Sequence, residues 1–128
     1  MIMDNNAVSQ IIIAAASNTA LPASERALIV YNMLKGKDFK GKYRKVHPDY
    51  DEHGNEILRE FIGTLNYEEL EKHSESYRTW LEEKEWKASK GVVQRKEPYE
   101  YGNVQYWDIE KDKFRNFKID NLISIEIS

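Results

Sequence analysis

The C-terminal third of the chain is a succession of β-type segments, and it restricts the fold more than any other feature. Glu100–Ile109 is rich in aromatic and β-branched residues, Glu110–Lys113 is a polar turn, and Phe114–Ile119 is a second β-type segment. The last segment, Ile123–Ile127, alternates apolar and polar residues at every step, which indicates that one of its faces is buried. The sequence therefore predicts that the chain ends in an antiparallel sheet.

Two further strands are predicted upstream of this region. Phe39–Val46 alternates basic residues with aromatic and apolar ones, and Glu56–Leu65 can pair with it. Between them, His53-Gly54-Asn55 supplies a glycine that can adopt the positive φ of a hairpin loop. These segments bring the expected sheet to about five strands.

Helices are predicted for most of the remaining chain. Residues 7–16 are alanine-rich and favour a short helix, although their three consecutive isoleucines also suit a strand. A second helix starts near Pro22 and ends at Gly36. Asn66 and Glu69 have the spacing of a capping box, which predicts the start of one long helix that ends before Gly91.

These segments predict a single α+β domain over residues 1–128. Its parts are an N-terminal helical region (1–36), the strands of a small antiparallel β-barrel-like sheet (38–65 and 99–128), and an inserted helix (66–90). A chain of 128 residues with 41% hydrophobic and 32% charged residues is expected to fold around one core. The absence of cysteine, of a basic secretory leader and of a long apolar run predicts a cytoplasmic protein outside the membrane.

Charge is segregated along the chain. Lys35–Val46 holds six basic residues and one acidic residue, whereas Asp49–Glu75 holds nine acidic and two basic residues. Strand alternation places part of the basic group on one side, where it forms either a solubilising face or a row that grips phosphate or an acidic protein surface. The predicted phosphate- or partner-binding residues are Lys40, Lys42, Arg44 and Lys45, with Arg115 and Lys118 of the later hairpin as an extension.

Several aromatic residues lie near basic ones and are candidate contacts for a partner. Trp86, Tyr99 and Tyr101 can stack on a base or a protein side chain, or can close one end of the sheet as core residues. Of the neighbours Tyr106 and Trp107, only one is expected to face the core, because adjacent strand residues point to opposite faces.

Motifs for metal binding and for DNA reading are incomplete in this sequence. Asp49–Glu60 resembles a calcium-binding loop at some positions, but Glu56 stands where an apolar residue is required, so a solvated hairpin loop is preferred. A zinc or nickel site formed by His47 and His53 with Asp49 and Asp51 would lie on a mobile loop without thiolate ligands. The first two predicted helices resemble a helix-turn-helix unit, but the second carries only Arg26 before its last turn.

No residue pattern predicts catalysis or a bound cofactor. The sequence contains no nucleophile with an adjacent base, no glycine-rich phosphate loop and no distinctive carboxylate pair. We therefore expect a binding protein, with no cofactor and no metal, and not an enzyme.

The C-terminal strands also resemble a known family. The segment Val104–Ile123, and within it Phe114-Arg115-Asn116-Phe117-Lys118-Ile119-Asp120, is similar to WYL-type domains, most closely to their short phage-encoded branch. Phe114, Lys118 and Asn121 differ from the residues usual in that family. The resemblance implies a small barrel of the Src-homology-three type, a phage or bacterial origin, and a binding role in regulation or in phage–host conflict.

Two functions follow as hypotheses. In the first, a phage-encoded protein binds and modulates or inhibits a protein of the bacterial host, such as a defence effector, through its acidic surface and inserted helix. In the second, a nucleic-acid-binding accessory protein uses the basic strand and exposed aromatic residues. The resemblance favours the first, and a homodimer is compatible with either.

Overall fold

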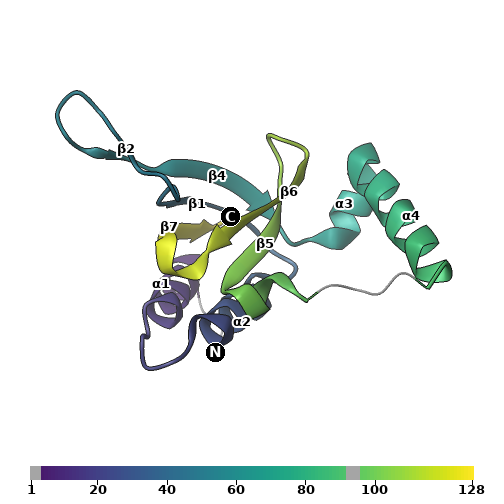
Figure 1. Cartoon of the computed structure of the whole chain (residues 1–128), viewed down its shortest axis with the longest axis horizontal. Helices are drawn as coiled ribbons and strands as arrows, with labels where there is room; N and C mark the ends of the chain where they lie inside the picture. The colour runs from purple at the N-terminus through teal and green to yellow at the C-terminus, as the bar shows by residue number, and fades with distance from the viewer. Residues whose placement is uncertain (1–3, 92–95) are drawn as a thin grey trace.

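A five-stranded antiparallel sheet forms the centre of the computed structural model, which describes residues 4–91 and 96–128 (Figure 1). The strand order is β6-β5-β4-β1-β7. The strands are β1 (Asp38–Tyr43), β4 (Arg59–Thr64), β5 (Asn103–Asp108), β6 (Lys113–Lys118) and β7 (Leu122–Ile127). A short 3-10 turn, Ile119–Asn121, connects β6 to β7 at the two edges. The α+β class and the five strands agree with the sequence prediction.

The sheet is open and does not close into a barrel, because within the described ranges β6 and β7 each pair with only one neighbour. Helices α1 (Asn5–Ala16) and α2 (Ala23–Leu34) cover its apolar face instead (Figure 1). Ile12 of α1 and Val30 and Leu34 of α2 are fully buried against the sheet. The two helices therefore shield the apolar face of the sheet from water, as the opposite wall would in a closed barrel.

Both predicted N-terminal helices are present. Helix α1 begins at Asn5, two residues before the predicted segment, because the Asp4 carboxylate accepts a hydrogen bond from the Ala7 N–H at 2.7 Å. Helix α2 begins directly after Pro22 and is followed by Gly36, whose φ of 75° is the left-handed conformation that glycine adopts readily.

The strands contribute a group of aromatic rings to the main core. Phe39, Tyr43, Phe61, Tyr106 and Phe117 come from four strands and contact one another with ring centroids 5.0 to 6.2 Å apart. These separations are within the range of favourable aromatic pairs. The rings anchor β1, β4, β5 and β6 to one another beneath the two helices.

The inserted segment forms two helices, so the prediction of one long helix was wrong. Helix α3 (Tyr67–His73) starts at the predicted Asn66 cap, and Ser74 then adopts an extended conformation (φ −114°, ψ 113°). Its hydroxyl accepts a hydrogen bond from the Tyr77 N–H at 3.1 Å and caps α4 (Glu75–Ser89). The chain therefore bends at Ser74 and carries α4 away from the sheet (Figure 1).

A second cluster lies on the opposite face of β5. Trp107 is 3% exposed and packs with Leu70 of α3 and Tyr77 of α4, and Trp80 and Phe114 pack at its margin. Tyr106 faces the main core and is fully buried. As expected, only Tyr106 of this pair faces the main core. Trp107 is nevertheless buried, because the inserted helices form a second cluster on the other face of β5, which the sequence did not predict.

Segment boundaries differ from the predictions where the chain leaves the sheet. Beyond β1 and before β4, strands β2 (Asp49–Tyr50) and β3 (Glu56–Ile57) form a separate two-stranded hairpin that projects from the sheet (Figure 1). Before β5, Pro98–Tyr101 is a 3-10 turn that ends at Gly102, so β5 begins at Asn103. Within the described residues, no helix is long and apolar enough to cross a membrane.

Candidate partner-binding surfaces

The four upstream cations of the predicted site occupy β1 and the base of the projecting hairpin. All four have an acidic neighbour: Lys40 Nζ lies 3.3 Å from Glu126 Oε2, Lys42 Nζ 3.5 Å from Glu60 Oε1, Arg44 Nε 3.7 Å from Glu56 Oε2, and Lys45 Nζ 3.1 Å from Asp49 Oδ2. The row is thus a ladder of ion pairs and carries little net charge.

The strand register creates this ladder. Lys40 stands directly opposite Glu126 on β7, and Lys42 directly opposite Glu60 on β4. Opposite residues in antiparallel strands have neighbouring side chains, so the charges meet across the strands. These side chains are at least half exposed, and each such pair contributes only about 0 to 1 kcal/mol to stability. Their principal effect is to reduce the charge available to an external anion.

Arg115 and Lys118 are in a different environment. They lie on β6, which β5 and β4 separate from β1, so they do not extend the row as predicted. Among the described residues, neither has an acidic group within ion-pair distance, and the same holds for Lys111 and Lys113 of the same hairpin. Strand β6 therefore carries three cations, Lys113, Arg115 and Lys118, that have no ion-pair partner among the described residues.

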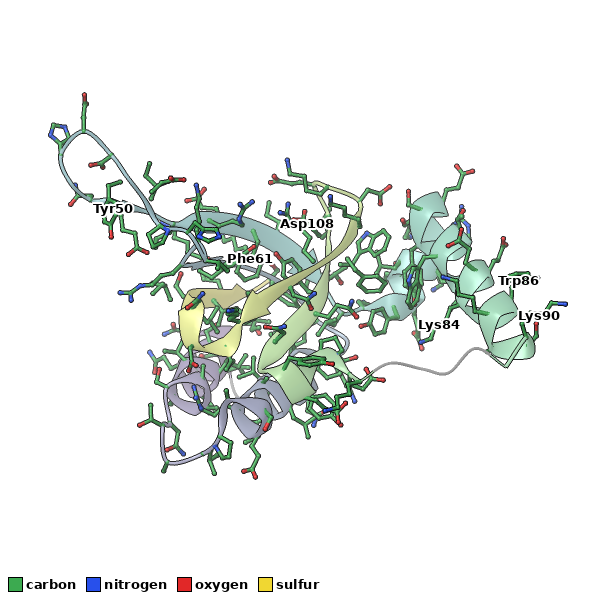
Figure 2. The ribbon with its side chains drawn as sticks, in the orientation of Figure 1. Tyr50, Phe61, Lys84, Trp86, Lys90 and Asp108 are labelled. Atoms are coloured by element: carbon green, nitrogen blue, oxygen red, sulfur yellow. The ribbon has the colours of Figure 1, made fainter. Side chains whose placement is uncertain are left out.

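Trp86 lies near the outer end of α4 and is 61% exposed (Figure 2). The Lys90 ammonium lies 6.0 Å from its ring centroid. From Glu82 to Ser89, every residue of the helix is exposed. The alternative role of Trp86 as a plug in the sheet is thereby excluded.

Tyr99 and Tyr101 lie in the 3-10 turn before β5 and have different surroundings. Tyr101 is 66% exposed, with the Lys96 ammonium 5.9 Å from its ring centroid. Tyr99 packs against the main core and lines a groove of about 200 Å³ between α2 and β5. Trp86, Tyr99 and Tyr101 therefore do not form one aromatic surface.

The groove beside Tyr99 was not predicted from the sequence. Tyr31 and Asn32 of α2 and Asn103 and Gln105 of β5 contribute to its walls. The Tyr31 hydroxyl lies 3.4 Å from that of Tyr67, and burial, followed by this contact, raises the pKa of Tyr67 above its ordinary range. No local motif marks these residues, because the groove exists only once α2 packs beside β5.

The acidic loop at the tip of the projecting hairpin matches the predicted hairpin loop. Gly54 has a φ of 82°, and Asp51 Oδ1 accepts hydrogen bonds from the His53 and Asn55 N–H groups, both at 2.9 Å. The Asp51 carboxylate therefore stabilises the turn. Across residues 4–91 and 96–128, no group of three or more histidine or acidic side chains is arranged to hold a metal ion.

Arg26 of α2 is buried. Its guanidinium donates to the carbonyl oxygens of Ala16 and Leu21 and to the carboxylate of Asp120. Because this side chain is committed to the interior, it is not available to read a DNA groove from α2.

Comparison with known proteins provides no relative for this chain. No family model matches the sequence, and neither a curated protein nor a solved structure is significantly similar to it.

Proposed function

We propose that this protein is a non-catalytic binding module that attaches to another protein and modulates it. In line with the resemblance of residues 104–123 to the phage-encoded branch of WYL-type domains, the proposed partner is a protein of a bacterial host, such as a defence effector. The observation that carries the proposal is the outer half of α4, a helix that extends beyond the sheet and presents Trp86 to solvent (Figure 2).

An exposed tryptophan on a projecting helix is typical of a protein contact. Large aromatic side chains are enriched among the residues that dominate binding free energy, and they act when a partner covers them. At the opposite end of the molecule, the projecting hairpin exposes Tyr50 (Figures 1 and 2), and Val46 lies in the segment that leads into it; each is more than 60% exposed. Two projections with exposed apolar groups suit a partner that is itself a folded protein.

The ion-pair ladder weighs against nucleic acid as the main partner. Affinity for a nucleic-acid backbone comes chiefly from cations that neutralise phosphates and release counterions. Lys40, Lys42, Arg44 and Lys45 already have acidic neighbours within 3.7 Å, so phosphates would have to compete with those carboxylates. The unneutralised cations of β6 keep nucleic-acid binding as the alternative.

The test compares capture by three forms of the tagged protein from nuclease-treated bacterial lysate. The forms are the wild type, Trp86→Ala, and Tyr101→Ala, which removes an equally exposed ring from the body of the molecule. We expect wild type and Tyr101→Ala to retain the same protein. Binding of that purified protein by Trp86→Ala is expected to be at least about tenfold weaker, as for a residue that dominates an interface.

Two results would contradict the proposal. One is retention of nucleic acid alone, lost on nuclease treatment, with affinity that falls steeply as salt increases. The other is equal capture by all three forms, which would place the contact elsewhere on the molecule. Because Trp86 is exposed, its replacement should leave the thermal unfolding midpoint unchanged, and this is measured on the same preparations.

A further inference from the structure

The two edges of the sheet differ in how they are covered. Helix α1 packs along β7, and the Ile127 N–H at that edge donates to the Ser9 hydroxyl at 3.2 Å (Figure 1). Strand β6 forms the other edge and, among the described residues, pairs only with β5. An uncovered edge presents backbone donors and acceptors to a further strand.

The hydrogen-bond register shows which groups of β6 are directed outward. The Ile119 N–H donates to the Gly102 carbonyl, so these two residues form a hydrogen-bonded pair at the end of β5 and β6. Hydrogen-bonded pairs recur at every second residue of an antiparallel ladder, so the others are Val104–Phe117, Tyr106–Arg115 and Asp108–Lys113. Phe117, Arg115 and Lys113 therefore direct their backbone groups toward β5. By the same alternation, Phe114, Asn116 and Lys118 direct their N–H and C=O groups away from the sheet.

The side chains of this edge are basic. Strand β6 contains Lys113, Arg115 and Lys118 and no acidic residue. Alternation places Lys113 and Arg115 on one face and Lys118 on the other, so cations flank the edge on both sides. None of the three has an ion-pair partner among the described residues. In the preceding turn, the acidic residues are Glu110 and Asp112, and Asp112 accepts hydrogen bonds from the hydroxyls of Ser74 and Ser76.

We propose that the β6 edge binds an extended, acidic segment of a partner protein by adding it to the sheet as a sixth strand. The outward backbone groups of Phe114, Asn116 and Lys118 supply the ladder, and the three cations select acidic side chains on both faces of the added strand. This inference rests on the proposed function, because it names the kind of segment that the protein partner offers.

The aromatic residues of β6 explain why a peptide fits this edge better than nucleic acid. Phe117 is 1% exposed in the main core, and Phe114 packs against Trp107 with ring centroids 5.0 Å apart. Neither ring is free to stack on a base, which single-stranded nucleic acid uses for much of its binding. The edge offers cations and backbone hydrogen bonds, and an acidic strand uses both.

The experiment titrates the full-length, isotope-labelled protein with a capped ten-residue peptide in which pairs of adjacent glutamates alternate with valine-threonine pairs, so that each face of the extended peptide carries glutamates. Amide chemical shifts are followed by NMR. The largest changes, and slower amide hydrogen exchange, are expected at Phe114, Asn116 and Lys118. The same peptide with alternate backbone nitrogens methylated is expected to bind at least tenfold more weakly, because it lacks the donors for one ladder.

A matched pair of variants tests the cations. Lys113→Gln/Arg115→Gln/Lys118→Gln is expected to weaken peptide binding at least tenfold. The control, Lys35→Gln/Lys72→Gln/Lys96→Gln, removes the same charge from exposed positions outside β6 and α4 and is expected to stay within twofold of wild type. Amide spectra of both variants report whether the sheet is intact.

Several results would overturn the inference: no binding of the peptide, equal binding of the methylated peptide, or tighter binding of a ten-nucleotide oligothymidylate at the same amides. Concentration-dependent self-association that buries these amides would also overturn it, by assigning the edge to a second copy of the chain. If the peptide fails while Trp86-dependent capture of a protein persists, the edge inference alone falls. If capture fails as well, the proposed function falls with it.

Discussion

Arg26 is expected to contribute substantially to stability through two hydrogen bonds to the backbone. Its side chain is 8% exposed, Nη1 donates to the Ala16 carbonyl at 2.8 Å, and Nε donates to the Leu21 carbonyl at 3.0 Å. Nη1 also lies 2.6 Å from Asp120 Oδ1, but that carboxylate is 64% exposed and can be solvated by water instead. The guanidinium thus joins the end of α1, the following loop and the turn before β7.

The expected loss for Arg26→Met is about 3 kcal/mol in the free energy of unfolding. Each backbone bond from a charged donor is worth about 1.5 kcal/mol or more, and methionine retains much of the buried apolar stem. The exposed ion pair adds less than about 1 kcal/mol, so Asp120→Asn, the control, should lose no more than that. The thioether cannot donate, so the two carbonyl oxygens lose their partner.

The assay is urea unfolding followed by circular dichroism, with the slope of the transition checked against wild type. Two results would refute the reasoning. If Arg26→Met were as stable as wild type, the cost of burying the guanidinium would equal what its bonds contribute. If Asp120→Asn lost as much as Arg26→Met, the ion pair and not the backbone bonds would be responsible.

Three further changes test other parts of the structure. The double variant Glu60→Gln/Glu126→Gln should free two lysines of the ion-pair ladder and raise the affinity for single-stranded oligonucleotides severalfold at low salt. Fluorescence anisotropy at two salt concentrations measures this affinity. No gain in affinity would show that the ladder does not neutralise the row. Tyr106 is fully buried, and this burial raises the pKa of its hydroxyl above the ordinary range. The Tyr43 hydroxyl is nearby, but among the described residues the Tyr106 hydroxyl has no partner in good hydrogen-bond geometry. Tyr106→Phe should therefore leave the urea midpoint unchanged or raise it, and a loss above about 1 kcal/mol would reveal a hidden hydrogen bond. Hydrogen bonds from the Ser76 hydroxyl, and to a smaller extent from the Ser74 hydroxyl, hold the pKa of Asp112 below its usual 3.8. The ionised carboxylate therefore stabilises the fold above about pH 4, and this contribution is lost as the pH falls through the lowered pKa. Asp112→Asn, which tolerates the φ of 54°, should reduce the loss of stability between pH 5 and pH 2, and identical pH profiles for the two proteins would contradict this role.

Local sequence signals located most of the elements correctly. The alternation of Ile123–Ile127, the Asn66 cap and the stop at Gly36 each act within a few residues, so they are readable without knowledge of the rest of the chain. The same holds for the glycine turn of the projecting hairpin. The α+β class and the approximate number of strands follow from these signals alone.

The candidate site was only partly predictable. Trp86 was identified as a candidate contact from the basic residues near it in the sequence. Its exposure, however, depends on where α4 leaves the sheet, and the bend at Ser74 determines that point. Tyr99 was grouped with Tyr101 because the two are close in sequence, yet one packs on the core and the other faces solvent. Side-chain environment is set by packing, and sequence proximity does not report it.

What the sequence determined by itself is the set of elements, their order and the positions of the basic residues. The tertiary structure decided which charges meet. Lys40 and Lys42 lost their apparent role as a free cationic row because Glu126 and Glu60 lie opposite them, one of them 86 residues away in the chain. Arg115 and Lys118 have no acidic residue opposite them, because Tyr106 and Asn103 of β5 occupy those positions and β6 has no second neighbour among the described residues. Strand register is a long-range property, fixed only when the whole core packs, and it alone determines which side chains face one another across a sheet.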